Sequence, residues 1–493
     1  MNNLAILPII IPLISGAILA FVHSKVSLSR TLAKLFMLIN LGVVIYLTLE
    51  VINYGTIILE TGEWVAPYGI VLVADSLAAV LVLTTNIIAV AAVFYAPHSL
   101  TEAKEKHYFY TFFFFIISGV SGAFLTGDLF NLFVFFEVLL IASYALIVLG
   151  GEKVQLRESL KYVLINVFSS ILFVTAIAFL YGVVGTVNMA QIAERVQEVD
   201  QQGILTTIGI LLFFVFATKA ALFPLYYWLP KSYIVPNPVV SALFAALLTK
   251  VGIYSIIRVF SLIFIHRPDL THEAFIWIAG LSMIFGVIGA LATNNIKLII
   301  AYNIIPAIGF IMMGIGFFNE SGMSGSIYYL IHDMIIKTAL FMLVGIIAYV
   351  AGTSDLRKMK GLIHDYPLLG WLLFIAAFVL AGIPPFSGFI GKIQLLKGAF
   401  ENGEVVIAII ALGTSLLILY SVMKIFIRGF WGERQTNNKL EKKPIFGMVT
   451  PVIFLLACST ILGIGAEWFV PTIESISSDL LNPQNYIDSV LKE

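Results

Sequence analysis

Residues 217–258 read ATKAALFPLYYWLPKSYIVPNPVVSALFAALLTKVGIYSIIR, and this stretch places two lysines inside long apolar runs. Each run is long enough for a membrane helix, because about 20 residues cross a hydrocarbon core of roughly 30 Å. Lys219 and Lys250 are each bracketed by apolar turns. Pro224 lacks an amide hydrogen and predicts a break in the helix that carries Lys219. The stretch predicts two membrane helices with buried charges, one of them broken.

The whole chain has the composition of a membrane protein. Its 493 residues are 60% hydrophobic and 11% charged, whereas soluble domains are about 25% charged. We therefore predict an all-α, polytopic membrane helix bundle and exclude a water-soluble fold. The first apolar run, residues 4–22, has no basic residue before it and contains two prolines, so we interpret it as the first span rather than a signal peptide.

Breaking the chain at charged and Pro/Gly/Asn clusters gives about fourteen spans. We expect them to begin near residues 3, 32, 70, 109, 128, 160, 204, 238, 272, 297, 324, 366, 404 and 446. Most Lys and Arg residues fall in alternate connections, around residues 25–34, 104–106, 153–161, 231, 297, 357–360 and 428–443. Because cytoplasmic loops are rich in these residues, we predict a cell-membrane protein with both termini on the extracytoplasmic side.

A few ionisable side chains remain inside the predicted spans. The positions are Glu137, Lys219, Lys250, Lys337 and Lys392. A lysine at the centre of a membrane helix costs about 2.5–3.5 kcal/mol. Such residues either fix helix packing as neutralised pairs or carry protons, since loss of water favours the neutral amine. We favour the proton-carrying role for Glu137, Lys219, Lys250 and Lys392.

His332, Asp333 and Lys337 fall close together in the eleventh span. Asp333 and Lys337 are an i,i+4 pair on one helical face. Two interpretations stay open: a self-neutralising pair, or a relay that joins Lys250 to Lys392 with His332 as a further proton acceptor.

A second break is predicted in the twelfth span, where Pro384 and Pro385 precede Lys392. Broken helices at corresponding places in two halves are typical of transporters built from repeats. The seventh and twelfth spans are five helices apart, which suggests a five-helix unit used twice. We divide the chain into three N-terminal helices (1–108), two five-helix units (109–260 and 272–430), and a last span with a short tail (446–493).

Three motifs in this order resemble a known family. They are LFNLFVFFEVLLIASY at residues 129–144, the stretch 217–258, and GIPPFSGFIGK at residues 382–392. Together they resemble the antiporter-like, proton-translocating subunits shared by respiratory complex I and Mrp-type multisubunit sodium/proton antiporters. The resemblance covers nearly the whole chain. It implies fourteen helices built around two inverted five-helix repeats.

The resemblance also implies roles for single residues. Glu137 matches the glutamate of span five that pairs with the lysine of span seven, here Lys219. Lys250 matches the lysine of span eight, and Lys392 the ionisable residue of span twelve. Tyr226 and Tyr233 stand where complex I relatives usually have histidines, a departure that resembles the D subunits of Mrp antiporters.

We therefore expect a transporter subunit rather than an enzyme, without a cofactor of its own. The single cysteine, Cys458, excludes an iron–sulfur cluster held by this chain's cysteines. The expected proton line runs through Glu137, Lys219, Lys250, His332, Lys337 and Lys392. Sodium fits this line poorly, because hard cations need several oxygen ligands. Its site, if there is one, is expected to involve partner membrane subunits.

Two other functions remain open from the sequence. The chain could be the proton-pumping membrane arm of a respiratory complex I or a membrane-bound hydrogenase, or a scaffold that conducts nothing. No feature predicts a nucleic-acid partner.

Overall fold

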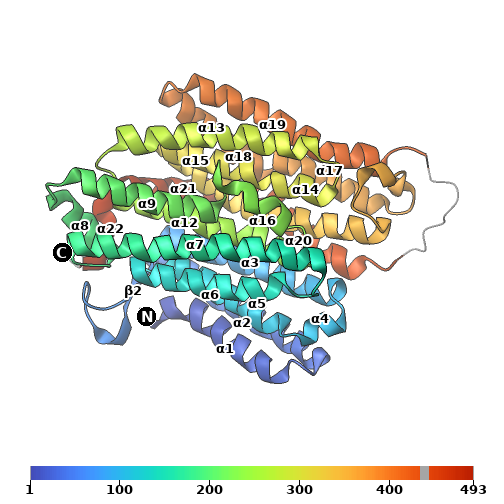
Figure 1. Ribbon diagram of the computed structural model, residues 1–493, viewed down its shortest axis with the longest axis horizontal. Helices are drawn as coiled ribbons and strands as arrows, with labels where there is room; N and C mark the ends of the chain where they lie inside the picture. The colour runs from blue at the N-terminus through green and yellow to red at the C-terminus, as the bar shows by residue number, and fades with distance from the viewer. Residues whose placement is uncertain (1, 434–442, 492–493) are drawn as a thin grey trace.

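The structure is a computed structural model that describes residues 2–433 and 443–491. It is a bundle of long helices that run side by side, with the N-terminal helices at one side and α13 and α19 at the other (Figure 1). The helices that form the first seven spans are α1 (Leu7–Val22), α2 (Val26–Tyr54), α3 (Ser76–Ser99), α5 (Phe109–Leu125), α6 (Leu129–Ile147), α7 (Lys153–Val184) and α9 (Gln202–Ala220).

The described part of the chain has seven further spans, three of which consist of two helices each. They are α11 (Pro238–Leu243) with α12 (Thr249–Leu262), α13 (Pro268–Ala292), α14 (Ile296–Tyr302) with α15 (Ile304–Phe317), α16 (Glu320–Ala351), α17 (Pro367–Ala381) with α18 (Ser387–Glu401), α19 (Val405–Ile425) and α20 (Phe446–Ile464). Within residues 2–433 and 443–491, twelve helices are long and apolar enough to cross a membrane, and α5 and α17 are shorter apolar helices. Each of the fourteen predicted spans contains one of them, so the helical membrane bundle is confirmed.

Both termini lie at the same end of the bundle, while α14 and the short helix α4 (Glu102–Lys106) lie at the other end (Figure 1). An even number of spans produces this arrangement. The predicted helix breaks are also present. α9 ends at Ala220, and the chain resumes with a short turn of helix (Leu225–Trp228) and α10 (Leu229–Ser232). α17 ends at Ala381, and α18 begins at Ser387.

Two strands and three helices in the described part of the chain lie outside the predicted spans. An antiparallel hairpin, β1 (Ile57–Glu60) with β2 (Val71–Ala74), precedes α3, so the chain is not purely helical. α8 (Met189–Arg195) follows the sixth span. The expected short tail after the last span instead forms α21 (Ala466–Leu481) and α22 (Pro483–Leu491). Both tail helices carry enough polar residues to escape a search for apolar runs.

Two loop junctions in different halves of the chain have the same hydrogen bonds. Each junction ties the start of one span to the loop after a later span through two backbone bonds of 2.9 Å. In the first junction, the Leu129 amide donates to the Val187 carbonyl and the Met189 amide to the Gly127 carbonyl. In the second, the Ile296 amide donates to the Ser354 carbonyl and the Leu356 amide to the Asn294 carbonyl. The helices that follow these loops, α8 and α14, lie at opposite ends of the bundle (Figure 1). This duplication accords with two repeats of opposite orientation.

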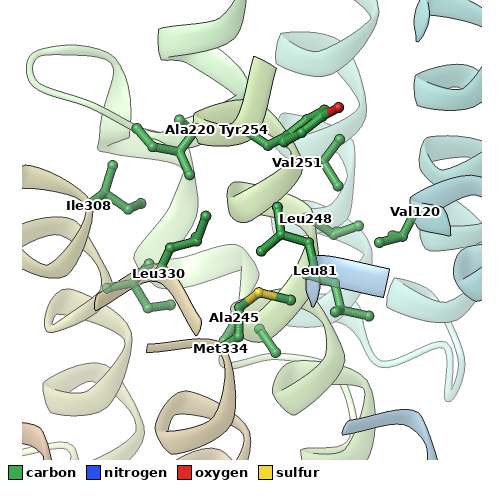
Figure 2. Packing of buried hydrophobic residues seen from close by; sticks show 14 of the residues in the cluster. Leu81, Val120, Ala220, Ala245, Leu248, Val251, Tyr254, Ile308, Leu330 and Met334 are labelled. Carbon is green, nitrogen blue, oxygen red and sulfur yellow. The ribbon is translucent and has the colours of Figure 1, made fainter. Parts of the chain in front are cut away.

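The spans Pro238–Leu262, Ile296–Phe317 and Glu320–Ala351 are the most enclosed part of the bundle. Apolar side chains from them and from α3, α5 and α9 pack together there (Figure 2). Ala220, Val251 and Met334 belong to this packing and are the chain neighbours of Lys219, Lys250 and Asp333. Lys219, Lys250 and Asp333 therefore lie within the most enclosed part of the bundle.

Candidate functional site

Two lysines share one carboxylate at the centre of the bundle. Asp333 Oδ2 lies 2.7 Å from Lys250 Nζ, and Asp333 Oδ1 lies 3.3 Å from Lys337 Nζ. All three side chains have 0% exposure. The Asp333–Lys337 pair confirms the predicted i,i+4 contact, while the contact with Lys250 comes from another helix. Two ammonium groups and one carboxylate leave one unbalanced positive charge, which is costly away from water.

A local distortion of the helix helps to hold Lys250. The five residues between α11 and α12, Phe244–Leu248, have π-helical hydrogen bonding. Such segments occur frequently at functional sites because they leave backbone groups free. Lys250 Nζ donates to the Ala245 carbonyl oxygen at 2.8 Å. The lysine is thus held by one backbone oxygen and one carboxylate.

His332 lies one residue before Asp333 and is also fully buried. Its Nδ1 is 2.8 Å from Ser387 Oγ at the start of α18. Among the residues that the structure describes, its Nε2 has no hydrogen-bond partner. The ring packs beside Tyr329, with 5.2 Å between the ring centroids. One ring nitrogen is therefore held by a hydroxyl group, and the other has no such contact within the described part of the chain.

Lys392 has no carboxylate partner among the described residues and is held by neutral groups instead. Its Nζ donates to the carbonyl oxygens of Ala381 at 2.7 Å and Leu380 at 3.3 Å. These carbonyls are left open because α17 ends there. The Phe310 ring lies 4.8 Å from the same nitrogen. The break at Pro384 and Pro385 therefore creates the binding site for the ammonium group. A positive charge is favourable there, because the C-terminal end of a helix is partially negative.

Glu137 and Lys219 are near one another but are not in direct contact. Lys219 Nζ donates to Ser170 Oγ at 3.2 Å and lies 4.9 Å from the centre of the Phe136 ring. Among the described residues, no ion pair within 4.0 Å joins Glu137 to that nitrogen, although Phe136, the chain neighbour of Glu137, lies beside it. Glu137 Oε1 is buried without a hydrogen-bond partner. The pair implied by the family resemblance is present here as two close, separated charges.

Trp228, rather than Lys219, binds a backbone carbonyl at the end of α9. Pro224 does break the helix, and Ala221 adopts a positive φ of 60° directly after α9. However, the Thr218 carbonyl accepts a hydrogen bond from Trp228 Nε1 at 3.1 Å. Lys219 turns instead toward α6 and α7. The predicted break in this helix is therefore present, and Lys219 donates to Ser170 rather than to the Thr218 carbonyl.

The predicted residues form two groups. Lys250, Asp333 and Lys337 are in contact, and His332 directly precedes Asp333 in the chain. The Tyr329 ring lies 5.2 Å from the His332 ring and 5.7 Å from Lys392 Nζ, which brings Lys392 to the same group. Glu137 and Lys219 form the second group. Across the described part of the chain, no hydrogen bond or ion pair joins Lys219 to Lys250. A proton passing between these groups would need water or side-chain movement.

Sequence reasoning did not assign the polar neighbours that hold these residues. Ser170, Ser387 and Ser459 are fully or nearly buried serines that contact the line directly or through one another. Asp333 was recognised, but its bridging place was not. A serine in an apolar helix gives no distinguishing pattern, because it also bonds to its own backbone.

Other charged residues have structural roles. Asp75 and Asp128 cap α3 and α6 and accept hydrogen bonds from Ala78 N and Asn131 N. Asp75 also pairs with the buried Arg258. Lys424 donates to carbonyl oxygens at the end of α13 rather than extending to solvent. Among the described residues, no group of three or more His, Cys, Asp and Glu side chains could hold a metal ion.

Comparison with known proteins agrees with this arrangement. The family model for the transmembrane region of NADH:quinone oxidoreductase and Mrp antiporters matches residues 126–418. The D subunit of the Na(+)/H(+) antiporter of Bacillus subtilis is 50% identical over the full length of both chains. This relationship confirms the resemblance to the D subunits of Mrp antiporters.

Solved structures have the same fold. A chain of the Mrp complex from Dietzia sp. DQ12-45-1b matches with a TM-score of 0.93 and 27% identity, covering 99% of each chain. A chain of respiratory complex I from Thermus thermophilus matches over the full length of both chains with a TM-score of 0.84 and 22% identity, which indicates a shared fold. The chain therefore belongs to the NADH:quinone oxidoreductase/Mrp antiporter transmembrane family.

Proposed function

We propose that this chain is the proton-translocating subunit of a multisubunit sodium/proton antiporter. The observation that carries the proposal is the buried trio Lys250, Asp333 and Lys337. Its charges balance only when one of the two amines is neutral. One proton can then reside on either lysine while Asp333 remains in contact with both. A packing pair would need only one lysine.

The other predicted residues continue the proposed proton pathway on both sides of this trio. Toward one side, Glu137 stabilises a charged Lys219 when it is ionised, and favours its proton's release when it is neutralised. Toward the other side, His332 and Lys392 accept the proton in turn. Lys392 can be charged without a carboxylate, because open carbonyls and an aromatic face bind its ammonium group. Proton position thus depends on the charge state of each neighbour.

We further propose the cellular setting. The subunit lies in the cell membrane with both termini outside, because the basic loops cluster at the opposite end from the termini. The units 109–260 and 272–430 are the two repeats, and 1–108 and 446–493 flank them. Other membrane subunits complete the antiporter, as in the Mrp complex that shares this fold. Those subunits contribute oxygen ligands for sodium.

Lys250→Ala tests the central step. Exchange is measured as initial proton/cation exchange in everted vesicles, with protein level and complex assembly checked by immunoblot and native gel. Lys250→Ala should abolish exchange in an assembled complex. Lys397→Ala is the matched control, because Lys397 is an exposed lysine paired with Glu401 at the surface. Normal exchange in the Lys250→Ala complex would refute the proposed line.

The need for partners has a separate test. The purified single polypeptide in liposomes should not support robust sodium/proton exchange, whereas the complex isolated in gentle detergent should. The same purification identifies the partner subunits. Recovery of dehydrogenase subunits instead of small membrane proteins would favour the respiratory alternative, and full exchange by the polypeptide alone would refute the multisubunit assignment.

A further inference from the structure

A chain of hydroxyl groups links His332 to the last membrane span. Ser387 Oγ, which lies 2.8 Å from His332 Nδ1, also lies 2.7 Å from Ser459 Oγ on α20. All three side chains are fully buried. α20 lies outside both five-helix units. The hydrogen-bond chain is therefore a connection between the proton line and a helix that the repeats do not contain.

Close backbone packing holds this connection in place. A side chain at Gly463 of α20 would overlap the Pro385 carbonyl and the Ser387 backbone at the break. A Cβ on Gly388 would lie 2.9 Å from the His332 ring. Glycine at both positions lets α20 and the ring approach the start of α18. Small movements of α20 would therefore reach Ser387 and the histidine.

The chain of hydroxyls can serve both neutral forms of His332. When Nδ1 carries the proton, it donates to Ser387, which donates to Ser459. When Nδ1 is bare, Ser459 donates to Ser387, which donates to the ring, since a hydroxyl both donates and accepts. Nδ1 is occupied either way. Within the described residues Nε2 has no partner. When Nδ1 carries its proton, Nε2 is the bare nitrogen that can take up a second proton and release it again.

We propose that Ser459 is a positioning residue for proton transfer at His332, acting through Ser387. This inference rests on the proposed function, in that it requires His332 to carry protons. Ser459 orients the imidazole and keeps Nδ1 occupied, so that transfer occurs at Nε2. The last span thereby contributes to a line that the sequence assigns to the two repeats alone.

Three substitutions at Ser459 separate the hydroxyl from its volume. Ser459→Ala and Ser459→Cys should each lower the initial exchange rate about threefold to tenfold, because a thiol keeps the size but is a weak donor. Ser459→Thr keeps a hydroxyl and should restore at least half of the rate. Ser477→Ala is the control, since Ser477 is equally buried and donates to the Glu320 carbonyl. It should leave the rate unchanged.

A double-substitution cycle tests whether Ser459 acts through His332. In a His332→Ala background, which should itself lower the rate, adding Ser459→Ala should cause no further loss, and both variants should have the same pH profile between neutral and alkaline pH. A merely structural serine would cause the same fractional loss in either background.

The outcomes distinguish two failures. Undiminished exchange in assembled Ser459→Ala and Ser459→Cys complexes, or an unchanged loss in the His332→Ala background, overturns the inference and leaves His332 in the proton line. Undiminished exchange in the His332→Ala complex removes His332 from the line and overturns the inference with it.

Discussion

The seventh and twelfth spans are both broken beside proline, but the backbone carbonyls at the two breaks bind different side chains. At the twelfth span, Lys392 follows the break and reaches back to the open carbonyls of Leu380 and Ala381. At the seventh span, Lys219 precedes the break, and the indole of Trp228 occupies the Thr218 carbonyl. Lys219 must therefore rely on Ser170, an aromatic face and the nearby charge of Glu137.

This difference indicates distinct roles for the two lysines. Backbone dipoles at the end of α17 help to stabilise the charge of Lys392. The charge of Lys219 depends on a carboxylate that can itself be neutralised. In the proposed line, fixed backbone dipoles thus hold the ammonium group of Lys392, whereas Lys219 lies near a carboxylate whose charge can change.

Removing the carboxylate should have the largest effect. Glu137→Gln keeps the size of the side chain but leaves Lys219 without a nearby negative charge, and should lower exchange by about 100-fold or more. Initial exchange in everted vesicles is the measurement. Glu401→Gln is the matched control, because Glu401 lies at the surface. Normal exchange by an assembled Glu137→Gln complex would remove the distinction between the two breaks.

Lys392→Arg tests whether the lysine at the twelfth-span break must release its proton. Arginine can still donate to the two carbonyls, but a guanidinium hardly releases its proton. We expect a folded, assembled complex whose exchange rate is lower by about 10-fold to 100-fold. Lys397→Arg, on the same helix and exposed, should exchange normally. An undiminished rate for Lys392→Arg from neutral to alkaline pH would exclude Lys392 as a proton carrier.

Trp228→Phe makes the seventh-span break more like the twelfth. It leaves the Thr218 carbonyl without its indole donor, which should lower the free energy of unfolding by about 1–2 kcal/mol. Thermal unfolding of the detergent-purified complex provides the measurement. Trp277→Phe is the control, because Trp277 is 59% exposed on α13. Equal stability of the two variants would mean that the indole is not needed to close the break.

Ser170→Ala should have the smallest effect. It removes one hydrogen bond of 3.2 Å from Lys219, and we expect exchange to fall by about twofold to fivefold. Thr175→Ala is the control, because Thr175 lies on the same helix and bonds only to its own backbone at Ile171. A loss as large as that of Glu137→Gln would make Ser170, rather than the carboxylate, the main partner of Lys219.

The amino-acid sequence was enough to predict the membrane bundle, its fourteen spans, the two breaks and the buried charges. These features depend on local properties: the length of an apolar run, the missing amide hydrogen of proline and the cost of a charge in hydrocarbon. The hairpin β1–β2 and the tail helices α21 and α22 escaped because short or polar elements lack such a signal.

The partner of each charge could be found only in the folded molecule. Asp333 meets Lys250 from another helix, and His332 meets Ser459 through Ser387. Lys392, rather than Lys219, binds the carbonyls of its break. These contacts join residues that are far apart in the chain or depend on which way a side chain turns. Packing of whole helices settles them, because a buried charge takes whichever polar group the neighbouring helices bring within reach.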